Sequence, residues 1–89
     1  MLERHVTVAI EEGLHARPAA LFARLAAEQP ATVQITRAGD APVPAGSVLG
    51  IMMLGAKAGD AVTLTTDEGV GAMEALDVLA AFLEQTVIA

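Results

Sequence analysis

The stretch that decides the fold is Ala61-Val62-Thr63-Leu64-Thr65-Thr66, which residues 67–71 separate from an apolar run that starts at Ala72. Val62 and Leu64 alternate with threonines, and this two-residue period is typical of a strand with one buried face. After residue 71 the period becomes that of an amphipathic helix, with apolar residues at Met73, Leu76, Leu79, Ala80 and Leu83. The sequence therefore predicts a strand at 61–66 and a long terminal helix that packs on the sheet.

The same two periods recur toward the N-terminus. Alternation at residues 3–10, through Val6, Val8 and Ile10, predicts a first strand. An Ala- and Leu-rich run at residues 16–28 predicts a helix, whose apolar face consists of Ala19, Phe22, Ala23 and Ala26.

The middle of the chain predicts a hairpin and a second, short helix. Residues 32–36 alternate with β-branched side chains, and Ala38-Gly39-Asp40 is typical of a turn. The prolines in 41–44 have no N–H to donate, so the second arm is expected to be a brief edge strand. Residues 48–54 predict a helix that ends before Gly55.

This order of elements indicates an α+β domain. We expect a four-stranded antiparallel sheet covered on one face by three helices, an open-faced sandwich of order β-α-β-β-α-β-α. Because the chain has 89 residues, we expect one domain that spans residues 1–89.

Composition excludes several classes of function. The formal net charge of −6 opposes binding to nucleic-acid phosphates, and the absence of cysteine excludes thiolate metal sites and disulfides. The sequence has neither a secretory signal nor the roughly 20 consecutive apolar residues of a membrane helix. We therefore expect a cytoplasmic monomer with no nucleic-acid or membrane partner, no metal and no cofactor.

The candidate site is the run Gly13-Leu14-His15-Ala16-Arg17-Pro18, where a strand gives way to a helix. The first N–H groups of a helix have no internal acceptor. Those of Ala16 and Arg17, together with the helix dipole, therefore favour a phosphate on His15. The planar guanidinium of Arg17 can hold two phosphate oxygens. An isolated histidine here would more simply be a surface residue, but the whole motif indicates a phosphoryl acceptor.

The run of residues 13–20 resembles the active-site signature of the HPr family, the phosphocarriers of the bacterial phosphoenolpyruvate:sugar phosphotransferase system. Gly46-Ser47-Val48-Leu49-Gly50 falls where that family has a regulatory serine and its second helix. The resemblance implies that phosphorylated Enzyme I donates to His15 and that a IIA component of a sugar permease receives the group. It also implies a cosubstrate carrying a phosphohistidine rather than an enzyme.

Ser47 has two interpretations. From the residues alone it is a helix N-cap, a position where serine is favoured. The resemblance implies that it is also a phosphorylation site for an HPr kinase/phosphorylase in organisms that have this enzyme.

The predicted short helix carries more apolar residues than one buried face can hold, and these are Val48, Leu49, Met52 and Met53. We expect some of them to be exposed, and the resemblance implies that they dock against partners beside Arg17 and Arg24. These arginines lie seven residues apart, near one helix face. The simpler interpretation is that each apolar residue belongs to a small core.

Other functions stay open. A nitrogen-related HPr paralogue would share the His15 chemistry and differ in its partners. A small-molecule-sensing regulatory domain of similar layout would bind its ligand at Glu11-Glu12-Gly13 and would not need His15. Residues 50–57 nearly form a P-loop, but Lys57 is displaced by one position and no Ser or Thr follows it, so nucleotide binding is not expected.

Overall fold

The computed structural model describes residues 1–88 and has the predicted order of elements. These are β1 (Leu2–Thr7), α1 (Ala16–Ala27), β2 (Val33–Arg37), β3 (Val43–Pro44), α2 (Val48–Leu54), β4 (Ala61–Thr66) and α3 (Ala72–Leu83). None of the helices within residues 1–88 is long and apolar enough to cross a bilayer.

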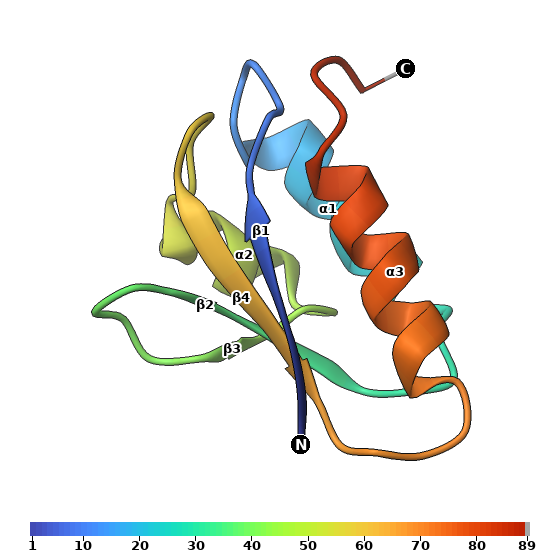
Figure 1. Ribbon diagram of the computed structural model, residues 1–89. Helices are drawn as coiled ribbons and strands as arrows, with labels where there is room; N and C mark the ends of the chain where they lie inside the picture. The colour runs from blue at the N-terminus through green and yellow to red at the C-terminus, as the bar shows by residue number, and fades with distance from the viewer. Residues whose placement is uncertain (89) are drawn as a thin grey trace.

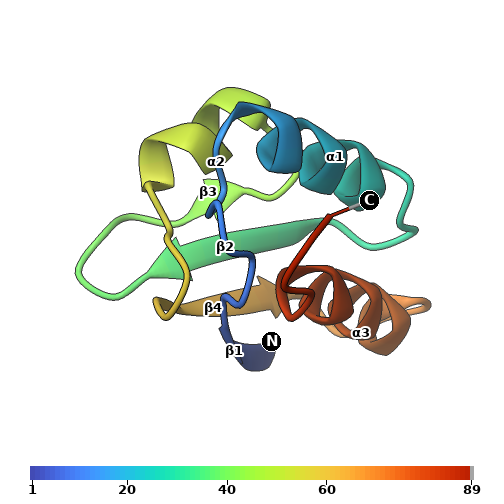
Figure 2. The same cartoon turned by 90° about the horizontal axis from the view of Figure 1, so that it is seen from above.

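The four strands form one antiparallel sheet in the order β1-β4-β2-β3. The short β3 lies at an edge, as its prolines predict. Figures 1 and 2 show α3 beside β1 and β4, and α2 beside α1 over the other half of the domain. The α+β open-faced sandwich is therefore confirmed.

The core follows the predicted faces of α1 and β4. Val62 and Leu64 are buried, and buried Thr66 donates its hydroxyl to the Thr32 carbonyl at 2.7 Å. α1 buries its predicted apolar face, and Phe22 meets Phe82 of α3 with 5.6 Å between ring centroids. This aromatic pair joins the two long helices.

The terminal helix differs from the prediction at one position. Leu76, Leu79, Ala80 and Leu83 are buried as expected, but the side chain of Met73 is 55% exposed. At about 100° per residue, Met73 lies at the margin of the buried arc. The face is completed instead by Ala72 and Ala75, so the prediction that Met73 faces the core was wrong.

β1 ends at Thr7, three residues before its predicted end, yet Val8 and Ile10 are buried. The chain stays extended but changes partners. Its N–H groups bond to carbonyls of the loop before β4 and of the C-terminal region, each at 2.9 Å: Val8 to Asp60, Ala9 to Leu83 and Glu11 to Thr86. This segment brings the C-terminal region to the start of α1.

Candidate functional site

His15 is the N-cap residue of α1. Its backbone is extended, with φ −80° and ψ −172°, and its carbonyl accepts the N–H of Ala19 at 2.8 Å. The His15 side chain makes no capping hydrogen bond and is exposed. The imidazole ring therefore projects to solvent at the helix start, within reach of another protein.

The first turn of α1 favours an anion beside that ring. Ala16 and Arg17 are the first two helical residues, and Pro18, the third, has no N–H. An α-helix provides no internal acceptor for the N–H groups of its first turn, and its dipole is positive there. Because this turn contains no acidic side chain, that positive end is not neutralised. A phosphoryl group on His15 would be stabilised by it.

Arg17 lies two residues after His15 and contacts Ile88. Its guanidinium donates to the backbone carbonyl of Ile88 at 3.0 Å, and Ile88 is itself packed on the core. The C-terminal segment therefore orients the predicted phosphate-binding residue. This contact could not be predicted from the sequence, because nothing in the local pattern links positions 17 and 88.

Residues 13–15, the site loop, rest on the residues that follow α2. The N–H of Leu14 donates to the carbonyl of Ala56 at 3.0 Å. Gly13 is buried with φ +73°, and a Cβ built on it would lie 3.0 Å from that same carbonyl oxygen and 3.3 Å from Lys57 Cα. A side chain at position 13 would therefore push the site loop off its support.

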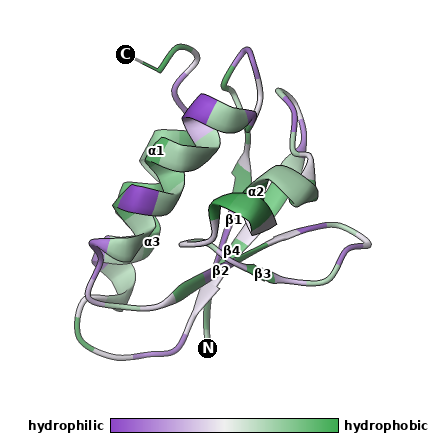
Figure 3. Ribbon diagram, turned by 180° about the vertical axis from the view of Figure 1, so that it is seen from behind, coloured by the Kyte–Doolittle hydropathy of each residue, from purple (hydrophilic) through white to green (hydrophobic). Residues whose placement is uncertain are grey.

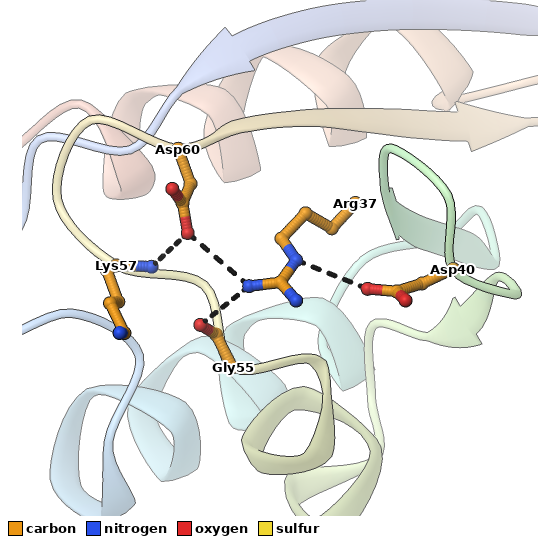
Figure 4. A network of polar contacts seen from close by, with 5 residues as sticks. All are labelled: Arg37, Asp40, Gly55, Lys57 and Asp60. Carbon is orange, nitrogen blue, oxygen red and sulfur yellow. Dashed lines mark hydrogen bonds and ion pairs between the residues drawn. The ribbon is translucent and has the colours of Figure 1, made fainter.

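A polar network centred on Arg37 holds the residues that follow α2, on which the site loop rests (Figure 4). The Arg37 guanidinium donates to Asp40 at 3.2 Å and to the Gly55 carbonyl at 3.1 Å, and it pairs with Asp60 at 3.5 Å. Asp60 also accepts the backbone N–H of Lys57 at 2.9 Å. Sequence reasoning missed this network, although the three-residue spacing of Arg37 and Asp40 across a turn was a weak signal for it.

The short helix α2 is capped at both ends as predicted. Ser47 accepts the N–H of Gly50 on its hydroxyl at 3.0 Å, and Gly55 ends the helix with φ +68°. Ser47 itself is half-buried.

Most of α2 faces outward. Only Ile51 and Leu54 are buried, whereas Leu49 is 69% and Met53 is 76% exposed. Figure 3 shows the apolar colour of α2 on the side of the molecule turned to the viewer. The exposed apolar residues of this helix, named here the α2 patch, are Val48, Leu49, Met52 and Met53. The interpretation that all four belong to the core was wrong.

The remaining predicted residue, Arg24, lies on α1. Arg24 is exposed, lies two turns after Arg17 on α1, and lines a groove with Leu21, Leu25 and Phe82. Because α2 packs against α1, the α2 patch and the two arginines belong to adjacent helices.

Comparisons with known proteins agree with this geometry. A family profile described as the PTS HPr component phosphorylation site matches residues 2–85. The phosphocarrier protein HPr of Streptomyces coelicolor is 45% identical over 80 residues, which are 90% of this chain and 85% of the relative. The phosphocarrier protein NPr of Shewanella violacea is 41% identical over 83 residues, or 93% and 89% of the two chains.

Solved structures show the same likeness. The crystal structure of a phosphocarrier protein HPr from Bacillus anthracis superposes with a TM-score of 0.85 at 43% identity. The match covers 92% of this chain and 95% of that one.

Proposed function

This chain belongs to the HPr family of phosphotransferase-system phosphocarriers, and from that premise we propose that His15 accepts a phosphoryl group from phosphorylated Enzyme I. It then passes the group, in the cytoplasm, to a IIA component of a sugar permease. The observation that carries the proposal is the exposed His15 ring at the start of α1, two residues before Arg17. This ring makes no capping hydrogen bond to the helix. Family membership leaves the alternative of a small-molecule sensor without support.

The transfer needs a nucleophile and a place for the charge of the phosphoryl oxygens. The electron pair of a His15 ring nitrogen forms a bond to phosphorus while the bond between phosphorus and the donor atom breaks, and the donor keeps that electron pair. The N–H groups of Ala16 and Arg17 and the Arg17 guanidinium stabilise the equatorial oxygens. In the second transfer the His15 nitrogen is the leaving group, so the protein is recovered unchanged. It acts as a cosubstrate.

Both partners must reach the same ring, so we infer that they share one docking surface. The α2 patch lies on the helix that packs against α1, and Arg17 and Arg24 lie on α1 itself. Methionine side chains adapt to differently shaped partners, and the arginines suit acidic surfaces. This surface fits a carrier that binds two different proteins in turn.

Ser47 is the proposed regulatory site, for an HPr kinase/phosphorylase. Its hydroxyl caps α2 directly before the α2 patch. Phosphorylation would add roughly −1.5 to −2 charges there. The added charge would repel an acidic partner and lower phosphoryl transfer to His15.

The test uses Enzyme I, phosphoenolpyruvate and three forms of this protein. We expect the wild type to gain an acid-labile phosphoryl group and His15→Ala to gain none while keeping its fold. The matched control is His5→Ala, because His5 is also exposed but lies on β1, where its Nδ1 is 3.0 Å from Thr63 Oγ1. Uptake by His15→Ala equal to that of the control would contradict the proposal.

The same assay distinguishes the two phosphotransferase branches. A preference for the nitrogen-related Enzyme I over the sugar-related one would assign the chain to the nitrogen branch. The reverse preference supports sugar uptake as proposed.

A further inference from the structure

Lys57 is the only lysine of the chain and lies in the loop between α2 and β4. Its backbone is held in a turn, because its N–H donates to the Asp60 carboxylate and its carbonyl accepts the Asp60 N–H, both at 2.9 Å. The network around Arg37 fixes Asp60 in turn, at 3.5 Å. The starting point of the Lys57 side chain is therefore well defined.

The ammonium group itself is not used by this network. Figure 4 shows the Lys57 side chain directed away from Asp60 and Arg37. Within residues 1–88 the ion pairs involve Arg4 and Arg37, and no carboxylate lies within ion-pair distance of the Lys57 ammonium. The Lys57 ammonium is therefore exposed and available to an anionic group in a chain of net charge −6.

Lys57 lies beside the site loop. The point that a Cβ would occupy on Gly13 lies 3.3 Å from Lys57 Cα and 3.8 Å from Cδ2 of the His15 ring. Leu14, between these two residues, bonds to the carbonyl of Ala56 next to Lys57. The four methylene groups of a lysine are long enough to span the distance from Lys57 Cα to the His15 ring. The ammonium can therefore reach a group attached to that ring.

We propose that Lys57 is a further phosphate-binding residue of this site, whose ammonium contacts the phosphoryl group carried by His15. The proposal rests on the proposed function, since it concerns the phosphorylated form of that histidine. Arg17 approaches from α1 and is oriented by Ile88, whereas Lys57 approaches from the α2–β4 loop on a flexible stem. An ammonium is a compact charge with three donors, so it can follow the phosphoryl oxygens as the group arrives and leaves.

The contact can be tested without a partner protein. Because the chain has one lysine, protein labelled with ¹³C-lysine gives a single lysine Cε signal by NMR. Phosphoramidate, a chemical phosphoryl donor, is used on a His5→Gln background so that His15 is the one remaining histidine. We expect the Cε signal to shift on phosphorylation and to return on hydrolysis. A lysine signal that stays in place while the backbone amides of Leu14 and Ala16 shift would overturn the proposal.

Kinetics provide the second measurement. At about 4 Å in water the attraction of two unit charges corresponds to roughly a fivefold change in rate. We therefore expect Lys57→Met to slow transfer from Enzyme I about fivefold and Lys57→Arg to restore most of the rate. Arg4→Gln is the control, since it removes the same charge from β1, where Arg4 pairs with Asp77. Equal rates for Lys57→Met and Arg4→Gln would overturn the proposal.

The two measurements separate this inference from the proposed function. A shifted lysine signal in the chemically phosphorylated protein, with no uptake from Enzyme I, would uphold the contact and contradict the partner assignment. Normal uptake from Enzyme I with an unshifted lysine signal would support the partner assignment and contradict the contact between Lys57 and the phosphoryl group.

Discussion

Replacing Gly13 by Ala places a methyl group between the site loop and the turn that supports it. The backbone there has φ +73°, a conformation in which a Cβ costs roughly 1–2 kcal/mol. The new carbon would also lie 3.0 Å from the Ala56 carbonyl oxygen and 3.3 Å from Lys57 Cα, and neither is the movable end of a side chain. The site loop must therefore shift and weaken the bond from Leu14 to Ala56.

The size of the effect follows from these two terms. A backbone hydrogen bond contributes about 0.5–1.5 kcal/mol, so Gly13→Ala should lower the free energy of unfolding by about 1.5–3.5 kcal/mol in total. Gly59→Ala is the matched control, because Gly59 has φ +93° but no heavy atom within 4 Å of its added Cβ. It should lose only the backbone term, about 1–2 kcal/mol.

Urea unfolding of the wild type and both variants measures these differences. Phosphoryl uptake from Enzyme I, at a temperature where all three are folded, measures the effect on His15. We expect slower uptake in Gly13→Ala than in Gly59→Ala, because the ring moves with the site loop. Equal stability and equal uptake in the two variants would refute the claim that the turn after α2 positions the ring.

Three other substitutions test separate parts of the site. Arg17→Lys should fold normally but transfer the phosphoryl group about tenfold more slowly, because an ammonium replaces a guanidinium that can donate two parallel hydrogen bonds. Unchanged transfer rates would exclude Arg17 from the mechanism. Met53→Glu should slow exchange with Enzyme I and with IIA to a similar extent and change stability by no more than about 0.5 kcal/mol in thermal melts. Val70→Glu, at a position 96% exposed before α3, should leave both exchanges unchanged; a loss with one partner alone in Met53→Glu would argue against a shared surface. Ser47→Ala should cost about 1 kcal/mol in urea unfolding, because Gly50 loses its acceptor; unaltered stability would contradict the capping role.

Elements with strong local signals were predicted with their observed bounds. β4 at 61–66 and α2 at 48–54 begin and end at the predicted residues, because alternation, a serine N-cap and a glycine stop are all local. The end of β1 depends on contacts with residues that are distant in the sequence. Val8 and Ile10 continue the alternation and are buried, but Val8 bonds to the loop before β4, whereas Ala9 and Glu11 bond to residues near the C-terminus. No period in the sequence could indicate this change of partner.

The candidate site also has parts with a local sequence signal and parts without one. His15, Ala16 and Arg17 could be predicted from the sequence as a candidate site because one short motif contains them and the start of the helix. The contacts of Arg17 with Ile88 and of Arg37 with Gly55 and Asp60 join residues that are 71, 18 and 23 positions apart, respectively. Such contacts come from the packing of whole elements, so only the folded structure reveals them.

The strand order has a consequence for when the carrier becomes active. β4 pairs with β1 on one side and with β2 on the other, so that Leu2 is matched with Thr66. While the chain is being synthesised, the two earlier strands therefore have no common neighbour until residues 61–66 leave the ribosome. Pairings this distant in sequence must close long loops before any contact compensates for the lost chain entropy, which slows folding. The histidine near the N-terminus is made early, but its loop has a fixed support only once Ala56 and the strand that follows it have emerged.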